Sequence, residues 1–202
     1  MKVSLKTFAI ETLEIAQWNV LKAIFRLKPQ DFEVQIRPYF NPINWIVGHL
    51  TIQMDYIFNF LCQGKRMTSD AFRHFYYAPR EKIEEIRDFP LSIMELIDLF
   101  LEVSKSSFDY LEVLPEYKYH ELPEKNENNV ETVSELIQRV SLHFLGHTGQ
   151  IIWIKKYLGK GGAFVMGVKK KQRDDSLAKW QKWWSENKEK YKEKDNQNVI
   201  LN

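Results

Sequence analysis

The sequence predicts an all-α fold: a four-helix bundle followed by one further, amphipathic helix. Four long segments repeat apolar residues every three or four positions, which is the spacing of a helix that buries one face. Almost no stretch alternates polar and apolar residues as a half-buried strand would. The long connections before and after the third segment leave room for helices that are not neighbours in sequence to pack together. The four segments lie at about 5–27, 41–63, 92–113 and 132–158.

Length and composition restrict the class of protein. The chain has 202 residues, which is the size of one domain with a substantial core. Its net charge of +2 is too small to indicate a nucleic-acid-binding protein by itself. Cys62 is the single cysteine, which excludes an intrachain disulfide and a cysteine-rich zinc site. Glu11 comes before any signal-like apolar run can form, and no stretch is apolar for long enough to cross a bilayer. We therefore expect a cytoplasmic protein.

The first two helices are predicted from periodicity and from their ends. The first is expected from Leu5 to Leu27, a stretch without glycine or proline. The second is expected to begin at Asn41 and Pro42, because asparagine is a favoured N-cap and proline is favoured at the first helical position. It should end before Gly64. Its apolar face, with His49 on the flank, consists of Ile43, Val47, Leu50, Met54, Ile57 and Leu61.

The third and fourth helices both open with the spacing of a capping box, in which a Ser or Thr N-cap is followed three residues later by Glu. Ser92 and Glu95 begin the third helix, which should reach about residue 113. Thr132 and Glu135 begin the fourth. Gly159 should end the fourth helix, because glycine is the commonest residue just past a helix C-terminus.

Residues 65–90, between the second and third helices, are rich in aromatic side chains and weakly patterned. A short helix is expected after Pro79. Two interpretations of the aromatic run stay open: it is a lid or pocket wall beside a ligand, or it packs on the bundle. The run consists of Phe72, Phe75, Tyr76 and Tyr77.

Beyond Gly162 the composition changes, and we expect residues 164–202 to extend a domain formed by residues 1–163. Residues 169–194 carry ten Lys and Arg against five Asp and Glu, a net charge of +5. An amphipathic helix should start near Asp174. A basic patch with interleaved aromatic residues can bind nucleic acid. Regular aromatic spacing instead favours a face that docks on the bundle while the lysines point into solvent. That face consists of Leu177, Trp180, Trp184 and Tyr191.

Two histidines in the fourth helix are the strongest functional signal. His143 and His147 lie four residues apart on the apolar stripe, so their imidazoles should project side by side towards the core. Burying both rings is costly unless they find partners, and one metal ion would satisfy both. A metal site needs at least a third ligand, and His49 is the best candidate. Histidines held in the core by hydrogen bonds are the alternative.

Two of these histidines directly follow a glycine. Gly48 precedes His49 and Gly146 precedes His147, although glycine inside a helix costs about 1 kcal/mol relative to alanine. We expect both glycines to permit a close approach by a helix, a metal ion or a ligand.

Two segments resemble the DinB/YfiT-like metalloenzyme superfamily over about residues 5–160. The stretch at 41–49, Asn-Pro-Ile-Asn-Trp-Ile-Val-Gly-His, follows the pattern N-x-I-x-W-x-x-x-H. The stretch at 143–150, His-Phe-Leu-Gly-His-Thr-Gly-Gln, follows H-x-x-x-H-x-G-Q. The resemblance implies an up-down-down-up bundle with a divalent metal ion, zinc or nickel, on His49, His143 and His147. It also implies a homodimer and a small-molecule substrate, since family members of known activity include transferases and isomerases that use low-molecular-weight thiols.

The motif also excludes one class of enzyme. Zinc proteases of the H-E-x-x-H type place a Glu general base directly after the first histidine, and this chain has Phe144 there. Any chemistry must rely on the ion as a Lewis acid or on a base from elsewhere. Gln150, one turn past His147, could take a catalytic supporting role by orienting a ligand or a water molecule, or it could form an interhelical hydrogen bond.

The leading interpretation is a metal-dependent transferase that activates a small thiol and has neither a membrane nor a nucleic acid as partner. The alternatives are a metal-assisted hydrolase, a non-catalytic bundle that binds a metal or ligand, and a nucleic-acid-associated protein that uses the basic tail. Four other candidate residues are expected to take no part. Asp55 lies too far along its helix from His49, Cys62 should be a core thiol, and His74 and His120 should lie at the surface.

Overall fold

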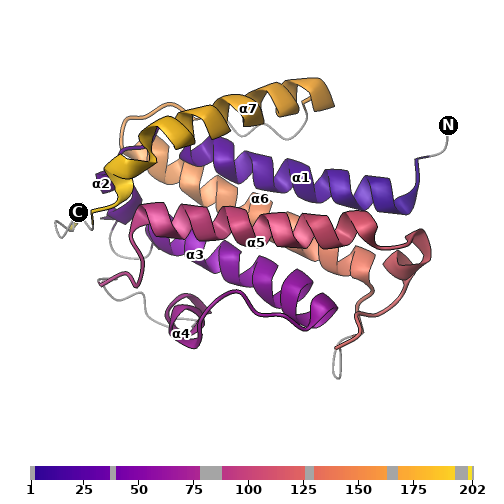
Figure 1. Cartoon of the computed structure of the whole chain (residues 1–202). Helices are drawn as coiled ribbons and strands as arrows, with labels where there is room; N and C mark the ends of the chain where they lie inside the picture. Colours follow the sequence, from indigo (N-terminus) through magenta and orange to yellow (C-terminus); the bar gives the residue numbers. More distant parts are fainter. Residues whose placement is uncertain are drawn as a thin grey trace.

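A computed structural model describes residues 3–36, 40–77, 88–125, 130–162, 168–193 and 200–201. Within these residues the chain is helical apart from one short strand pair, which confirms the predicted all-α class, and Figure 1 shows how the helices are arranged. A parallel pairing of two short strands, β1 (Gln35–Ile36) and β2 (Ile200–Leu201), was not expected. The α-helices are α1 (Leu5–Ile24), α2 (Pro29–Glu33), α3 (Ile43–Met54), α4 (Asp70–Tyr77), α5 (Ile93–Val113), α6 (Val133–Tyr157) and α7 (Lys170–Asn187).

Three short helical turns complete the described chain. The π-helix η1 (Asp55–Leu61) continues α3 directly, and Gly64 follows with a positive φ of 70°. The expected end of the second helix before Gly64 is therefore confirmed. The 3₁₀ turns η2 (Glu116–His120) and η3 (Lys188–Tyr191) follow α5 and α7. None of the helices in the described ranges combines the length and apolar character that a membrane span requires.

The four long helices pack in pairs around a common core. Helix α1 lies along α6, and α3 lies along α5. Contacts between α3 and α6 join the two pairs. Phe100 of α5 and Phe144 of α6 are fully buried, and their ring centroids lie 6.1 Å apart. The three elements that carry the candidate ligands and their supports, α3, α4 and α6, thus share one packed interior.

Both predicted capping boxes are present and explain why α5 and α6 begin where they do. The Ser92 amide donates to Glu95 Oε2 at 2.8 Å, and the Glu95 amide donates back to Ser92 Oγ at 3.3 Å. The Thr132 amide donates to Glu135 Oε2 at 2.7 Å, and the reciprocal bond measures 3.4 Å. These reciprocal bonds satisfy amides that the first helical turn cannot pair by itself.

Two predicted helix ends are wrong by a few residues. Asn41 is not the N-cap of α3: Pro42 is, because its extended backbone (ψ 160°) still lets its carbonyl accept from the Ile46 amide at 3.1 Å. Helix α1 ends at Ile24 rather than Leu27, because Arg26 adopts a positive φ of 58°, a left-handed conformation that cannot continue the helix.

Helix α4 precedes the position at which a short helix was expected. The region directly after Pro79 lies outside the described residues. Ser69 begins α4, since its hydroxyl accepts from the Phe72 amide at 3.2 Å. Phe72 and Tyr76, one turn apart, are buried, and the helix packs on α3. Figure 1 shows α4 on the opposite side of α3 from α7.

Helix α7 starts at Lys170, four residues before the expected start near Asp174. It packs along α1 with Trp180 and Trp184 buried, and Tyr191 of the following turn η3 is buried too. Trp184 Nε1 donates to Asp98 Oδ1 of α5 at 2.8 Å. The division of the chain at residue 163 stays a prediction, but the aromatic face of α7 lies against the main helices.

Replacing Trp184 by Ala should lower the free energy of unfolding by about 3–5 kcal/mol, because a large buried side chain is lost and a cavity is left. Denaturation in urea measures this change. Lys179→Ala, on the exposed side of α7, is the matched control and should change stability by about 0.5 kcal/mol or less. If truncation before Lys170 leaves stability unchanged and instead abolishes salt-dependent DNA or RNA binding, α7 is a nucleic-acid surface.

Candidate metal centre

His49 of α3 and His143 and His147 of α6 come together at the contact between these helices. One ring nitrogen from each lies within 4.8 Å of the others, and such a group could hold a metal ion. The ring centroids are 4.5 Å apart for His143 and His147 and 5.1 Å from His49 to each of them. The sequence brings the first two together by helical spacing, whereas His49 arrives through the packing of α3 on α6.

The three rings lie at the edge of the core, not inside it as the apolar stripe suggested. All three histidines are partly exposed. On α6, Phe144 and Thr148 are fully buried and follow His143 and His147 by one residue each. The inward stripe of α6 therefore runs beside the histidines, and solvent reaches the cluster from outside.

Two of the rings have a fixed acceptor for one nitrogen. His49 Nδ1 lies 2.9 Å from the main-chain oxygen of Tyr76. A carbonyl can only accept, so Nδ1 carries the proton and Nε2 of the neutral ring has a free lone pair. His147 Nδ1 lies 2.8 Å from Gln150 Oε1, which assigns the same tautomer to His147. Metal-binding histidines typically hold their second nitrogen in this way.

The contact between His49 and His143 tests whether the residues fit an ion. Their Nε2 atoms lie 3.0 Å apart. With the His49 proton on Nδ1, this contact is favourable only if His143 donates from Nε2 or if a cation lies between the lone pairs. Two nitrogens bound tetrahedrally to zinc at about 2.0–2.1 Å are roughly 3.4 Å apart. A small opening of the contact therefore accommodates an ion, and the residues fit.

Electrostatics keep the rings in the form that binds metal. Burial, together with the neighbouring His147 and His49, lowers the pKa of His143 from 6.5 to about 4. Burial also lowers the pKa of His147 to about 4, although the Gln150 hydrogen bond opposes the shift. Burial lowers the pKa of His49 as well, partly offset by the bond to the Tyr76 carbonyl. All three imidazoles are neutral at pH 7, as metal ligation requires.

The two glycines that precede histidines behave differently. A Cβ on Gly48 would lie 2.3 Å from the Tyr76 ring, so only glycine admits that ring so close to α3. A Cβ on Gly146 would meet nothing within 4 Å, so no helix of the described chain approaches there, and an approach by a metal ion or a ligand stays a prediction. Trp45, one turn before His49, stacks on the His49 ring with centroids 4.9 Å apart and planes at 9°.

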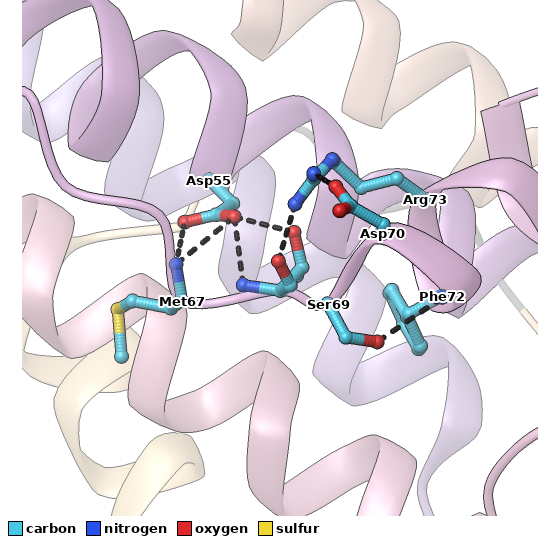
Figure 2. A network of polar contacts seen from close by, with 7 residues as sticks. Asp55, Met67, Ser69, Asp70, Phe72 and Arg73 are labelled. Carbon is cyan, nitrogen blue, oxygen red and sulfur yellow. Dashed lines mark hydrogen bonds and ion pairs between the residues drawn. The ribbon is translucent and has the colours of Figure 1, made fainter.

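The remaining candidates lie outside the histidine group. Cys62 is buried, and burial raises the pKa of its thiol to about 12, so it is a core thiol as expected. His74 and His120 are exposed. Asp55 belongs to a separate buried network with Met67 and Thr68 (Figure 2).

Sequence patterns did not predict one contact of the candidate site, the bond between His49 and the main-chain carbonyl of Tyr76. Of the four residues in the aromatic run, Phe72 and Tyr76 are buried, and their helix packs on α3. It is the backbone of Tyr76, not its ring, that reaches His49. No residue type predicts such a contact, since every residue carries a carbonyl.

No protein-family model, curated protein or solved structure matches this chain.

The metal-free protein should lose stability as the pH falls from about 6.5 to about 4. In this window the unfolded chain, with histidine pKa near 6.5, binds protons that the folded His143 and His147 do not. Urea denaturation in the presence of a chelator at pH 7.5, 6 and 5 measures the slope. A His143→Gln, His147→Gln variant should show a shallower slope, and exposed His74→Gln should not. Equal slopes in all three proteins would contradict the lowered pKa values.

Proposed function

We propose that this protein is a metal-dependent enzyme of the DinB-like type, with a divalent ion on His49, His143 and His147. The four long helices then correspond to the up-down-down-up bundle of that family. The observation that carries the proposal is the convergence of three neutral imidazoles from two helices. The fixed Nδ1 partners of His49 and His147 support it, because they leave both Nε2 lone pairs free for an ion.

The donor set favours a thiol-dependent transferase over a hydrolase. Three neutral ligands leave the charge of a divalent ion uncompensated and a coordination position free. Within the described ranges, no Asp or Glu joins the three histidines as a further potential ligand. A bound zinc-like ion would lower the pKa of a small thiol and favour its thiolate, a soft and well-matched ligand. A thiolate formed there would need no resident base, and it could attack an electrophilic carbon of a second substrate, whose leaving group would depart with the electron pair of the broken bond.

In this mechanism the residues of the chain hold the ion and orient its histidine ligands. The Tyr76 carbonyl fixes the tautomer and rotation of His49, and Gln150 does the same for His147. Phe144, next to His143, is fully buried, whereas the three histidines are partly exposed, so ligands would enter from the exposed edge of α6. The proton released by the thiol passes to solvent at that edge.

Metal content is the first measurement. The freshly purified protein should contain close to one equivalent of a divalent metal by element analysis, and His143→Ala should contain almost none. His120→Ala is the matched control, because His120 is exposed and outside the group, and it should retain the metal. Equal metal content in wild type and His143→Ala would refute the ligand assignment.

The reaction class is tested with cobalt-substituted protein. Adding a small thiol should change its visible absorption spectrum, and transfer of that thiol to an electrophilic acceptor should require both the metal and His147. His147→Ala should lose both effects. A spectrum that responds to carboxylate or phosphate compounds and to no thiol would favour metal-assisted hydrolysis instead. A spectrum indifferent to all of them would favour a non-catalytic metal-binding protein.

A further inference from the structure

Tyr76, the last residue but one of α4, contacts α3 through three different groups. Its ring lies against Gly48, where a Cβ would come within 2.3 Å of it. Its hydroxyl donates to Asn44 Oδ1 at 3.0 Å, and burial raises the pKa of this phenol, so it stays protonated. Its main-chain carbonyl accepts from His49 Nδ1 at 2.9 Å. One fully buried residue therefore packs along α3 from Asn44 to His49.

The other end of the same segment is tied to the helix that continues α3. Asp55, the first residue of η1, is fully buried. Its Oδ1 accepts from the Met67 amide at 3.0 Å, and its Oδ2 accepts from the Thr68 amide at 3.0 Å and the Thr68 hydroxyl at 2.5 Å. Figure 2 shows the Asp55 carboxylate facing this loop, with Arg73 bonded to Asp70 beyond it.

Residues 67–77, here called the strap, are thus fixed to α3 and η1 at both ends. Between the two attachments, Arg73 also donates to the Thr68 carbonyl, which closes the turn that leads into α4. Phe72 is buried and its ring lies 4.5 Å from the Tyr76 ring. The strap is therefore attached at its start to the Asp55 carboxylate and at its end to the surface of α3 beside Gly48.

We infer that the strap is a positioning device for His49, and that Asp55, Gly48 and Tyr76 are its positioning residues. A neutral imidazole can carry its proton on either nitrogen, and the Tyr76 carbonyl selects Nδ1 and thereby presents the Nε2 lone pair to the site. The inference rests on the proposed metal site for its consequence. Its structural readout, the tautomer of His49, does not need a metal.

The coupling between strap and site is reciprocal. A strap that holds His49 in its ligand tautomer strengthens metal binding, so by linkage a bound metal must stabilise the closed strap to the same degree. Hydrogen exchange at the Met67 and Thr68 amides should slow when metal is added, although neither residue belongs to the ligand group. Asp55 would then influence metal affinity without touching the ion.

The decisive comparison is between the two glycines that precede a ligand. In Gly48→Ala the methyl group must displace the Tyr76 ring and with it the carbonyl, whereas in Gly146→Ala it meets no atom within 4 Å. Nitrogen-15 NMR of the metal-free protein at pH 7.5, assigned with His49→Gln, reports the tautomer. We expect the Nδ1–H form in wild type and Gly146→Ala, and a mixture in Gly48→Ala. Cobalt affinity should fall about 10- to 100-fold in Gly48→Ala alone.

A second pair covers the case in which Gly48→Ala does not fold. Asp55→Asn keeps one acceptor oxygen but places an NH₂ group against donors of the strap. Asp98→Asn is its control, because Asp98 accepts from Trp184 and Lys188 of the C-terminal region instead. We expect faster exchange of the Thr68 amide and weaker cobalt binding in Asp55→Asn, and neither in Asp98→Asn.

The outcomes separate this inference from the proposed function. If Gly48→Ala or Asp55→Asn folds and lowers stability, yet keeps the wild-type tautomer of His49 and wild-type cobalt affinity, the strap is packing only and the inference is overturned. If the wild type binds no cobalt, the proposed function fails. The tautomer of His49 in the variants then still decides whether the strap orients the ring.

Discussion

The contact between α3 and α6 depends on how three neutral imidazoles satisfy their nitrogens. A polar atom that is shielded from water without a partner costs free energy, and three adjacent, half-buried rings have six nitrogens to satisfy. The Tyr76 carbonyl and Gln150 accept the Nδ1 protons of His49 and His147. The Nε2 atoms of His49 and His143 then face each other, with one proton or one cation able to satisfy both. The two solutions need nearly the same side-chain positions, so the site is organised before any ion binds.

That organisation depends on close packing more than on polar contacts. Glycine at position 48 costs α3 about 1 kcal/mol of helical stability, and in exchange the Tyr76 ring reaches the helix surface. The carbonyl that orients His49 belongs to the same residue. Trp45 stacks on the His49 imidazole and thereby fixes the plane of that ring. A histidine held by a helix, an aromatic ring and a buried carbonyl has few rotamers left, which is the rigidity that a ligand site requires.

The features that could be predicted from the sequence are those that depend on residues close together in the chain. Capping boxes placed the starts of α5 and α6, and helical spacing paired His143 with His147, because both depend on residues within one or two turns. Helix α4 was not predicted at its position, because burial of its aromatic residues against α3 stabilises it and no local pattern reveals that packing. The contact of the Tyr76 carbonyl with His49 could not be predicted for a simpler reason: it involves a main-chain atom, which every residue carries. The two glycines looked alike in sequence, and only the neighbouring chain distinguishes them.

The partial exposure of the histidines bears on the chemistry as much as their identity does. A deeply buried site that deprotonates its substrate needs a resident base, because water cannot remove the proton. Phe144 occupies the position at which zinc proteases carry that base, and it is fully buried. At the edge of the core, solvent can take the proton of a nucleophile whose pKa is already low. A thiol, with a pKa near 8.5 before any cation approaches, satisfies this condition, and water would satisfy it as well once a zinc-like ion lowers its pKa from 15.7 to about 7. The open edge of the described group would therefore let the proposed thiol lose its proton to solvent, and it is the softness of a thiolate, not its pKa, that favours it over water at a zinc-like ion.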